Sequence, residues 1–228
     1  RLALERLEHV GQGGAAEVRH AHRLERARKT ARIAGLYPIV DDTPKRRHDL
    51  RSVLSAILVG GAQVVQLRLK HTRDRESLEL ARWAVDRAHA AGALLIVYHR
   101  FDLAALPGVV GVHLGAEDVA VERVPPAIRD ELLVGLSTHT LEHVEASRAR
   151  PVDYIGFGPI FATGSKASEY TPRGIPLLAQ AADRARVPVV AIGAIGAKTI
   201  AEVKRAGAAA AAVISAISLG ERSVEATA

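Results

Sequence analysis

Short apolar runs alternate with longer amphipathic stretches along the chain from about residue 36 onward. Each run holds four to six residues, many of them β-branched, without the polar alternation of a strand that has one wet face. Such runs are typical of strands buried on both faces of a parallel sheet. We expect eight of them to be strands, at residues 36–40, 63–67, 94–98, 111–114, 132–136, 154–157, 187–192 and 211–214.

The amphipathic stretches between these runs predict helices, several of which end at glycine, as helices often do. They lie at residues 49–59, 75–91, 141–148, 175–185 and 198–206. Eight alternating units of strand and helix predict an α/β fold, a (β/α)8 TIM barrel with right-handed crossovers. An open doubly wound sheet is less suitable, because Asp41, Asp42 and Thr43 follow the first strand where that fold has a glycine-rich motif.

Residues 1–34 precede the first predicted strand and have helical spacing in two pieces, divided by Gly11, Gly13 and Gly14. We therefore predict an N-terminal helical extension or linker at 1–34 and a barrel domain at 35–228. Only a short tail follows the last strand, so we expect the extension to pack on the barrel wall near that gap. Because the chain starts at Arg1 and contains no Met, we also expect it to continue a longer polypeptide.

Composition narrows the class of protein. The chain has no cysteine, which excludes disulfides and thiolate chemistry. The net charge of +6 is concentrated at the start, where residues 1–35 carry eight Lys or Arg and four Glu, and aromatic residues make up only 4%. We therefore predict no nucleic-acid partner. No apolar stretch suits a membrane span or a signal peptide, so we predict a cytoplasmic protein with no membrane contact and leave open a homo-oligomer.

In a barrel of this type the active site is built from the carboxyl ends of the strands and the loops after them. After the second predicted strand, alternation places Gln66, Arg68 and Lys70 on one face, where they would point into the mouth. After the fourth strand, Glu117 and Asp118 offer hard oxygen ligands for Mg²⁺ or a helix cap, and their spacing favours neither.

Hydroxyl, imidazole and lysine side chains follow the fifth and sixth predicted strands. Ser137 and His139 could bind phosphate oxygens or transfer a proton. Thr163, Ser165 and Lys166 lie within four residues and suit an anion. We therefore expect this part of the rim to hold a negatively charged group.

The loops after the seventh and eighth strands contain small residues around Gly193, Ile214 and Ser215. Small residues let backbone N–H groups approach and cradle a phosphate at this position of a barrel. The pattern thus predicts a phosphate cradle, together with a second anion-binding pocket at Arg68, Lys70 and Lys166. Two anionic groups imply two phosphorylated substrates or one bisphosphate.

Five motifs, in order along residues 35–218, resemble the thiamine phosphate synthase and TenI-type thiazole tautomerase superfamily. They are Gln66-Leu67-Arg68-Leu69-Lys70, His113-Leu114-Gly115-Ala116-Glu117-Asp118, Gly135-Leu136-Ser137-Thr138-His139-Thr140, Asp153-Tyr154-Ile155-Gly156-Phe157-Gly158-Pro159-Ile160-Phe161 and Val190-Ala191-Ile192-Gly193. The resemblance implies a barrel enzyme of thiamine biosynthesis. Such an enzyme joins hydroxymethylpyrimidine diphosphate to thiazole phosphate with Mg²⁺ and releases pyrophosphate through a dissociative reaction.

The resemblance also implies a role for each candidate residue. It makes Gln66 a substrate contact and His139 and Lys166 catalytic residues. The diphosphate is assigned to Arg68, Lys70 and Lys166, Mg²⁺ to Asp118, and the diphosphate or pyrimidine to Ser137. The thiazole substrate is assigned to Thr163 and Ser165, and the thiazole phosphate to the backbone around Gly193, Ile214 and Ser215.

Three departures from the family pattern bear on activity. Tyr98-His99-Arg100 stands where the synthases carry Asn-Asp-Arg, so one carboxylate ligand of Mg²⁺ is absent, and Leu69 and Ala194 replace a Glu and a Gly. The first hypothesis is a synthase with altered metal binding, preferred because the three cations and Asp118 are retained. The second is a thiazole tautomerase in which His139 moves the proton without Mg²⁺. The third is a non-catalytic barrel that binds a thiamine-pathway phosphate.

Overall fold

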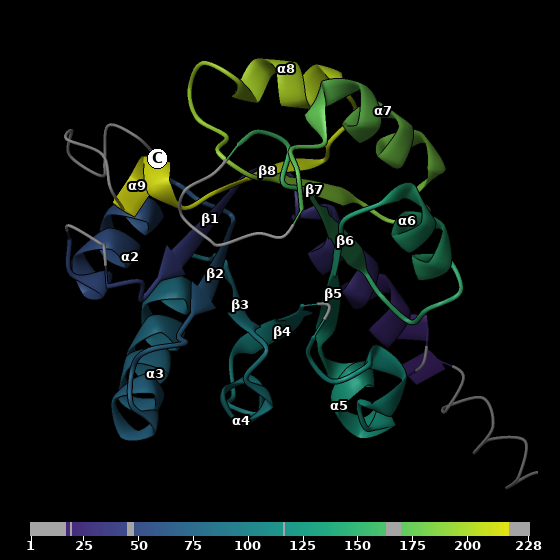
Figure 1. The fold of residues 1–228 in the computed structure, drawn as a ribbon. Helices are drawn as coiled ribbons and strands as arrows, with labels where there is room; N and C mark the ends of the chain where they lie inside the picture. The colour runs from purple at the N-terminus through teal and green to yellow at the C-terminus, as the bar shows by residue number, and fades with distance from the viewer. Residues whose placement is uncertain (1–16, 19, 45–47, 116, 163–169, 219–228) are drawn as a thin grey trace, which may run out of the picture.

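Eight parallel strands form a closed barrel in which each strand pairs with its sequence neighbours and β8 pairs with β1 (Figure 1). The computed structural model describes residues 17–18, 20–44, 48–115, 117–162 and 170–218. The strands are β1 (Gly35–Asp41), β2 (Val64–Arg68), β3 (Leu94–Tyr98), β4 (Val109–Leu114), β5 (Leu133–Thr138), β6 (Tyr154–Phe157), β7 (Val189–Ile192) and β8 (Ala210–Val213). The predicted (β/α)8 barrel is confirmed, and each predicted strand overlaps an observed one.

Helices surround the barrel on the outside (Figure 1). They are α2 (Leu50–Val59), α3 (Asp74–Ala90), α4 (Phe101–Ala104), the 3-10 helix η1 (Val121–Arg123), α5 (Pro126–Glu131), α6 (Leu141–Ser147), α7 (Gly174–Arg184), α8 (Ile200–Arg205) and α9 (Ser215–Ser218). The five predicted helices correspond to α2, α3, α6, α7 and α8. Helices α4, α5, α9 and η1 were not predicted; α4, α9 and η1 have only three or four residues each, too few to display a repeating apolar face.

The apolar core has two layers, because the strands are buried on both faces. On β2, Val65 and Leu67 pack outward against the helices, whereas Val64 belongs to a cluster inside the barrel. The inner cluster also contains Tyr37 and Tyr154, both fully buried. This double burial explains why the strands appear in the sequence as continuous apolar runs.

The described part of the N-terminal extension covers the amino-terminal end of the barrel. Residues 20–31 are helical, and Arg26 on this helix forms a bidentate ion pair with Asp153, just before β6, at 2.6 and 2.7 Å. Arg32 donates to the backbone oxygen of Gln63, just before β2, and Ile33 is 1% exposed inside the barrel. The expected position on the barrel wall was therefore wrong, since these contacts lie at the amino-terminal ends of the strands. The domain boundary after residue 34 stays a prediction.

No helix in the described part of the chain is both long enough and apolar enough to cross a membrane.

Candidate active site

A cavity of about 140 Å³ lies within the mouth of the barrel, and all eight strands contribute to its wall. Seven of the predicted site residues line it: Gln66, Arg68, Ser137, His139, Gly193, Ile214 and Ser215. The structure therefore brings together side chains that are up to 149 positions apart in the sequence (215 − 66). Convergence of polar groups on one concave, partly apolar space is typical of a small-molecule site.

Arg68 forms the cationic side of the cavity. Its Nη1 lies 2.8 Å from Oδ2 of Asp41, on the neighbouring strand, and Asp41 also accepts the backbone N–H of Thr43 at 2.9 Å. The guanidinium carbon lies 5.4 Å from the ring centroid of Tyr98. A guanidinium has five N–H donors, so this anchored side chain keeps donor capacity for an anionic ligand.

Lys70 lies on the rim, outside the cavity lining. Its side chain is exposed, and its Nζ lies 5.0 Å from the centroid of the same Tyr98 ring that Arg68 contacts. Burial raises the pKa of Tyr98, the charge of Asp118 raises it further, and Arg68 opposes both. Tyr98 is therefore a neutral platform between the two cations.

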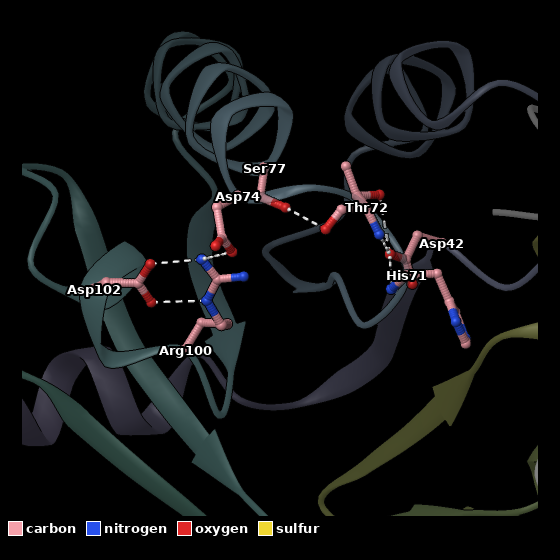
Figure 2. Close-up of polar contacts among 7 residues, drawn as sticks. All are labelled: Asp42, His71, Thr72, Asp74, Ser77, Arg100 and Asp102. Carbon is pink, nitrogen blue, oxygen red and sulfur yellow. Dashed lines mark hydrogen bonds and ion pairs between the residues drawn. The ribbon is translucent and has the colours of Figure 1, made fainter.

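Asp42 fixes the loop that carries Lys70 (Figure 2). Its buried carboxylate accepts the backbone N–H groups of Lys70, His71 and Thr72 at 2.9, 2.6 and 2.7 Å, and the Thr72 hydroxyl at 3.0 Å. Burial opposes ionisation, but these hydrogen bonds together outweigh it and lower the pKa of Asp42. The Thr72 carbonyl in turn accepts from Ser77 on α3, so the loop is anchored at both ends.

Arg100 ties the next loop to the same helix (Figure 2). Its guanidinium binds Asp102 at 2.8 and 2.6 Å and reaches Asp74, the first residue of α3, at 3.1 Å. The hydrogen bond from Arg100 lowers the pKa of Asp102. The loops after β2 and β3 are thus held together as one rim.

Asp118 lies beside Tyr98 and His99, outside the main cavity. Its Oδ2 accepts the backbone N–H of Gly115 at 2.6 Å, and it lines a neighbouring hollow with His143. His99 adopts a left-handed backbone conformation with φ 51°. Burial lowers its pKa, although the charge of Asp118 opposes this, so the imidazole adds no positive charge at neutral pH.

Asp118 is the residue that would hold Mg²⁺ in this part of the structure. Within the described residues, no three His, Cys, Asp or Glu side chains are grouped to hold a metal ion. Proteins commonly bind Mg²⁺ through one or two carboxylates while substrate phosphates and waters complete the shell. Asp118 meets that requirement as a single carboxylate on the rim.

His139 faces the cavity from the end of β5. Its Nδ1 lies 2.7 Å from the carbonyl oxygen of Gly158, and its ring stacks on Tyr170 with centroids 4.0 Å apart. A carbonyl only accepts hydrogen bonds, so Nδ1 carries a proton. In the neutral ring Nε2 is then the basic nitrogen.

A tight turn after β7 lines the cavity together with Arg68, which lies at the end of β2, three strands away round the barrel. Gly193 has φ 116°, and a Cβ there would lie 2.7 Å from Ile160 N and Pro159 Cα. Ala194 keeps a left-handed conformation, with φ 47°, despite its side chain. The turn and Ser215, at the start of α9, both line the cavity and follow the paired strands β7 and β8. Their role as a phosphate cradle stays a prediction.

Five residues inside the barrel form a continuous hydrogen-bonded chain that sequence analysis missed as a unit. Tyr37 Oη donates to Gln66 Oε1 at 3.1 Å and lies 2.8 Å from Tyr154 Oη. His113 joins Tyr154 through Nδ1 at 3.1 Å and Ser137 Oγ through Nε2 at 3.0 Å. Both tyrosines resemble ordinary core residues in the sequence. For Tyr37 a signal exists, because the period of two along the first strand places it on the same face as Asp41.

Three predicted site residues, Thr163, Ser165 and Lys166, lie outside the described residues. Their roles stay predictions.

Comparison with known proteins identifies the family. The family model for thiamine monophosphate synthase matches residues 36–217. This chain belongs to the thiamine monophosphate synthase family. A thiamine-phosphate synthase from Anaeromyxobacter dehalogenans (strain 2CP-C) is 44% identical over 203 residues, which cover 89% of this chain and 88% of the relative. A second, from Chloroflexus aurantiacus (strain ATCC 29366 / DSM 635 / J-10-fl), is 39% identical over 80% of this chain and 84% of its own length.

Some relatives are longer than this chain. The matched region covers 47% of a thiamine-phosphate synthase from Synechococcus sp. (strain WH7803), which is 39% identical over 168 residues. Among solved structures, thiamine phosphate pyrophosphorylase from Pyrococcus furiosus has a TM-score of 0.76 and 31% identity, over 86% of this chain and 93% of that one. The matches confirm the predicted superfamily, the barrel and the prediction of a thiamine phosphate synthase-like enzyme.

Proposed function

We propose that this chain joins hydroxymethylpyrimidine diphosphate to thiazole phosphate and releases pyrophosphate. The observation that supports this best is a single cavity lined both by Arg68, at the end of β2, and by the turn at Gly193, at the end of β7. We assign one anionic group to each of these two parts of the wall. A reaction between a diphosphate and a monophosphate needs this arrangement, because each anionic group must be held while the two carbon skeletons meet.

Arg68 is proposed to hold the diphosphate with Lys70 and Lys166. The Asp41 contact fixes the guanidinium of Arg68, so little conformational entropy is lost on binding. Asp42 fixes the loop that carries Lys70, because its carboxylate accepts the Lys70 backbone N–H. The backbone around Gly193, Ile214 and Ser215 is proposed to take the thiazole phosphate, and the further contacts are assigned to Gln66 and Ser137 in the cavity and to Thr163 and Ser165.

In the proposed reaction the bond between the pyrimidine methylene carbon and the diphosphate oxygen breaks, and the thiazole nitrogen forms a bond to that carbon. Negative charge develops on the departing pyrophosphate, which preorganised cations stabilise. Asp118 would hold Mg²⁺, whose charge neutralises the diphosphate when it is bound. His139 would position the substrates or move a proton through Nε2. A cytoplasmic location and a homo-oligomer stay predictions.

A thiazole tautomerase is the second candidate, and one observation favours it. The Gly158 carbonyl fixes the proton of His139 on Nδ1, so Nε2 is basic at the wall of the cavity. A base in this position could move a proton on a thiazole ring without a metal.

A direct assay tests the two functions. Both substrates and Mg²⁺ are supplied, and thiamine phosphate and pyrophosphate are measured together. Equal amounts of the two products support the synthase, whereas isomerisation of the thiazole with neither product supports the tautomerase. Binding of thiazole phosphate with no reaction would support the non-catalytic barrel.

A matched pair of arginine variants sharpens the assay. Arg68→Met should reduce the rate of coupling on the order of a hundredfold, because a preorganised donor to the leaving group is lost. Arg75→Met on α3 is the control, since that side chain is 94% exposed and lies outside the cavity. Equal effects of the two changes would contradict the assignment of Arg68.

A further inference from the structure

The chain of hydrogen bonds inside the barrel has a direction that its first member sets. The Oε1 atom of Gln66 only accepts, and Tyr37 Oη donates to it at 3.1 Å. A phenol has one proton, so the Tyr37 proton is committed to Gln66. The 2.8 Å contact between the two tyrosines therefore requires Tyr154 to donate to Tyr37.

The same assignment of protons can be continued to the other end of the hydrogen-bonded chain. The proton of Tyr154 is used at Tyr37, so its oxygen accepts from Nδ1–H of His113 at 3.1 Å. A neutral imidazole with its proton on Nδ1 has a bare Nε2. That atom lies 3.0 Å from Ser137 Oγ and accepts the serine proton. Burial raises the pKa of Tyr37 and of Tyr154, which keeps both phenols protonated as this order requires.

We propose that Tyr37 and Tyr154 are positioning residues that hold His113 in its Nδ1–H tautomer, so that Ser137 presents hydrogen-bond acceptors to the cavity. In the opposite order, Nε2–H of His113 would donate to Ser137, and the serine hydroxyl would donate to the ligand, for example to a phosphate oxygen. With its proton committed to His113, Ser137 suits a ligand group that donates, such as a ring amino group. The family resemblance assigns Ser137 to the diphosphate or the pyrimidine, and the order of the chain selects the pyrimidine, whose ring carries an amino group.

The assignment to the pyrimidine rests on the proposed function, whereas the tautomer of His113 does not. The two are therefore measured separately. Nitrogen-15 NMR of the full chain with labelled histidine, at a pH above histidine titration, distinguishes a protonated ring nitrogen from a bare one. The His113 signals are assigned by their loss in His113→Gln. A single Nδ1–H tautomer is expected, and an Nε2–H tautomer or a mixture would overturn the proposal.

Two variants test how the order is set. Tyr37→Phe removes one oxygen and frees Tyr154 to donate to His113, so an Nε2–H population should appear. Gln66→Glu keeps an acceptor for Tyr37 and should preserve Nδ1–H. An unchanged tautomer in Tyr37→Phe, or a changed one in Gln66→Glu, would show that Tyr37 does not set the order.

Ligand binding tests the consequence for Ser137. The probes are the hydroxymethylpyrimidine alcohol, its analogue with oxygen in place of the amino group, and pyrophosphate. Ser137→Ala should weaken binding of the amino compound about fivefold and leave pyrophosphate binding unchanged. Weaker pyrophosphate binding with unchanged pyrimidine binding would overturn the proposal. An inactive enzyme with the expected tautomer would refute the proposed function alone.

Discussion

The ion pair that anchors the N-terminal helix makes a quantitative prediction about stability. Asp153 is only 10% exposed and receives three N–H groups, two from Arg26 and one from the backbone of Val134 in β5 at 2.7 Å. Asp153→Ala removes all three acceptor contacts: the strand N–H loses its side-chain acceptor, and the Arg26 guanidinium loses its carboxylate but keeps the backbone oxygens of Arg129 and Asp130. The pair is largely buried, with Arg26 28% and Asp153 10% exposed, so breaking it in this way costs about 3 kcal/mol of unfolding free energy.

Chemical denaturation measures this loss, and thermal melting should show a fall of about 10 °C in Tm for a chain of this size. Glu145→Ala is the matched control, because the Glu145–Arg184 pair has a similar 2.7 Å contact but is 52% and 41% exposed. An exposed pair contributes about 0.5 kcal/mol or less. The comparison therefore isolates burial and the backbone contact from charge pairing.

A double-mutant cycle with Arg26→Ala separates the helix from the strand. Arg26→Ala should cost less than Asp153→Ala, because Asp153 can still accept from Val134. The double variant should cost less than the sum of the two single changes, since both remove the same pair. An Asp153→Ala protein as stable as the Glu145 control would refute the view that this helix is part of the barrel's packing.

Three further predictions concern the rim and the cavity. Asp42→Ala should cost about 3 kcal/mol and raise KM for the diphosphate substrate, because the loop under Lys70 loses its acceptor. Since the pKa of Asp42 is lowered on folding, its contribution is complete above the ordinary Asp pKa and is lost only as the pH falls through the lowered value, which denaturation at a series of acidic pH values measures. Gly193→Ala should cost about 2 kcal/mol and raise KM for the thiazole phosphate in steady-state assays, because its φ of 116° and its neighbours exclude a Cβ. Asp118→Asn should raise the Mg²⁺ concentration for half-maximal coupling on the order of tenfold in a metal titration, and unchanged Mg²⁺ dependence would remove Asp118 from the metal site.

The sequence predicts the barrel well because burial of both faces makes each strand a continuous apolar run. It also predicts Gln66 and Arg68, because alternation on β2 places both on the inner face, and the register confirms this by pairing Ile39 with Gln66 and Asp41 with Arg68. A shift of one residue would turn both side chains away from the cavity. The position of the cationic wall therefore follows from the apolar pattern of the strand that carries it.

Contacts between residues far apart in the sequence produce no comparable local pattern. The helical pattern before residue 34 shows an apolar face but does not say which end of the barrel it covers, which the distant partner of Arg26 decides. Asp41 and Asp42 are adjacent carboxylates with different partners, an arginine for one and a loop backbone for the other. Long-range pairing of this kind depends on barrel closure, which no local window contains.

The hydrogen-bonded chain inside the barrel depends on a residue that contributes no side chain to it. The register places Gly135 of β5 opposite His113 on β4 and opposite Tyr154 on β6. A Cβ at Gly135 would overlap the Tyr154 ring and the Nδ1 atom of His113. The two side chains can therefore meet across the intervening strand only because that strand has glycine at this position. Since this contact sets the tautomer of His113, the absence of a side chain at Gly135 is as much a part of the proposed selectivity of Ser137 as the tyrosine hydroxyls are.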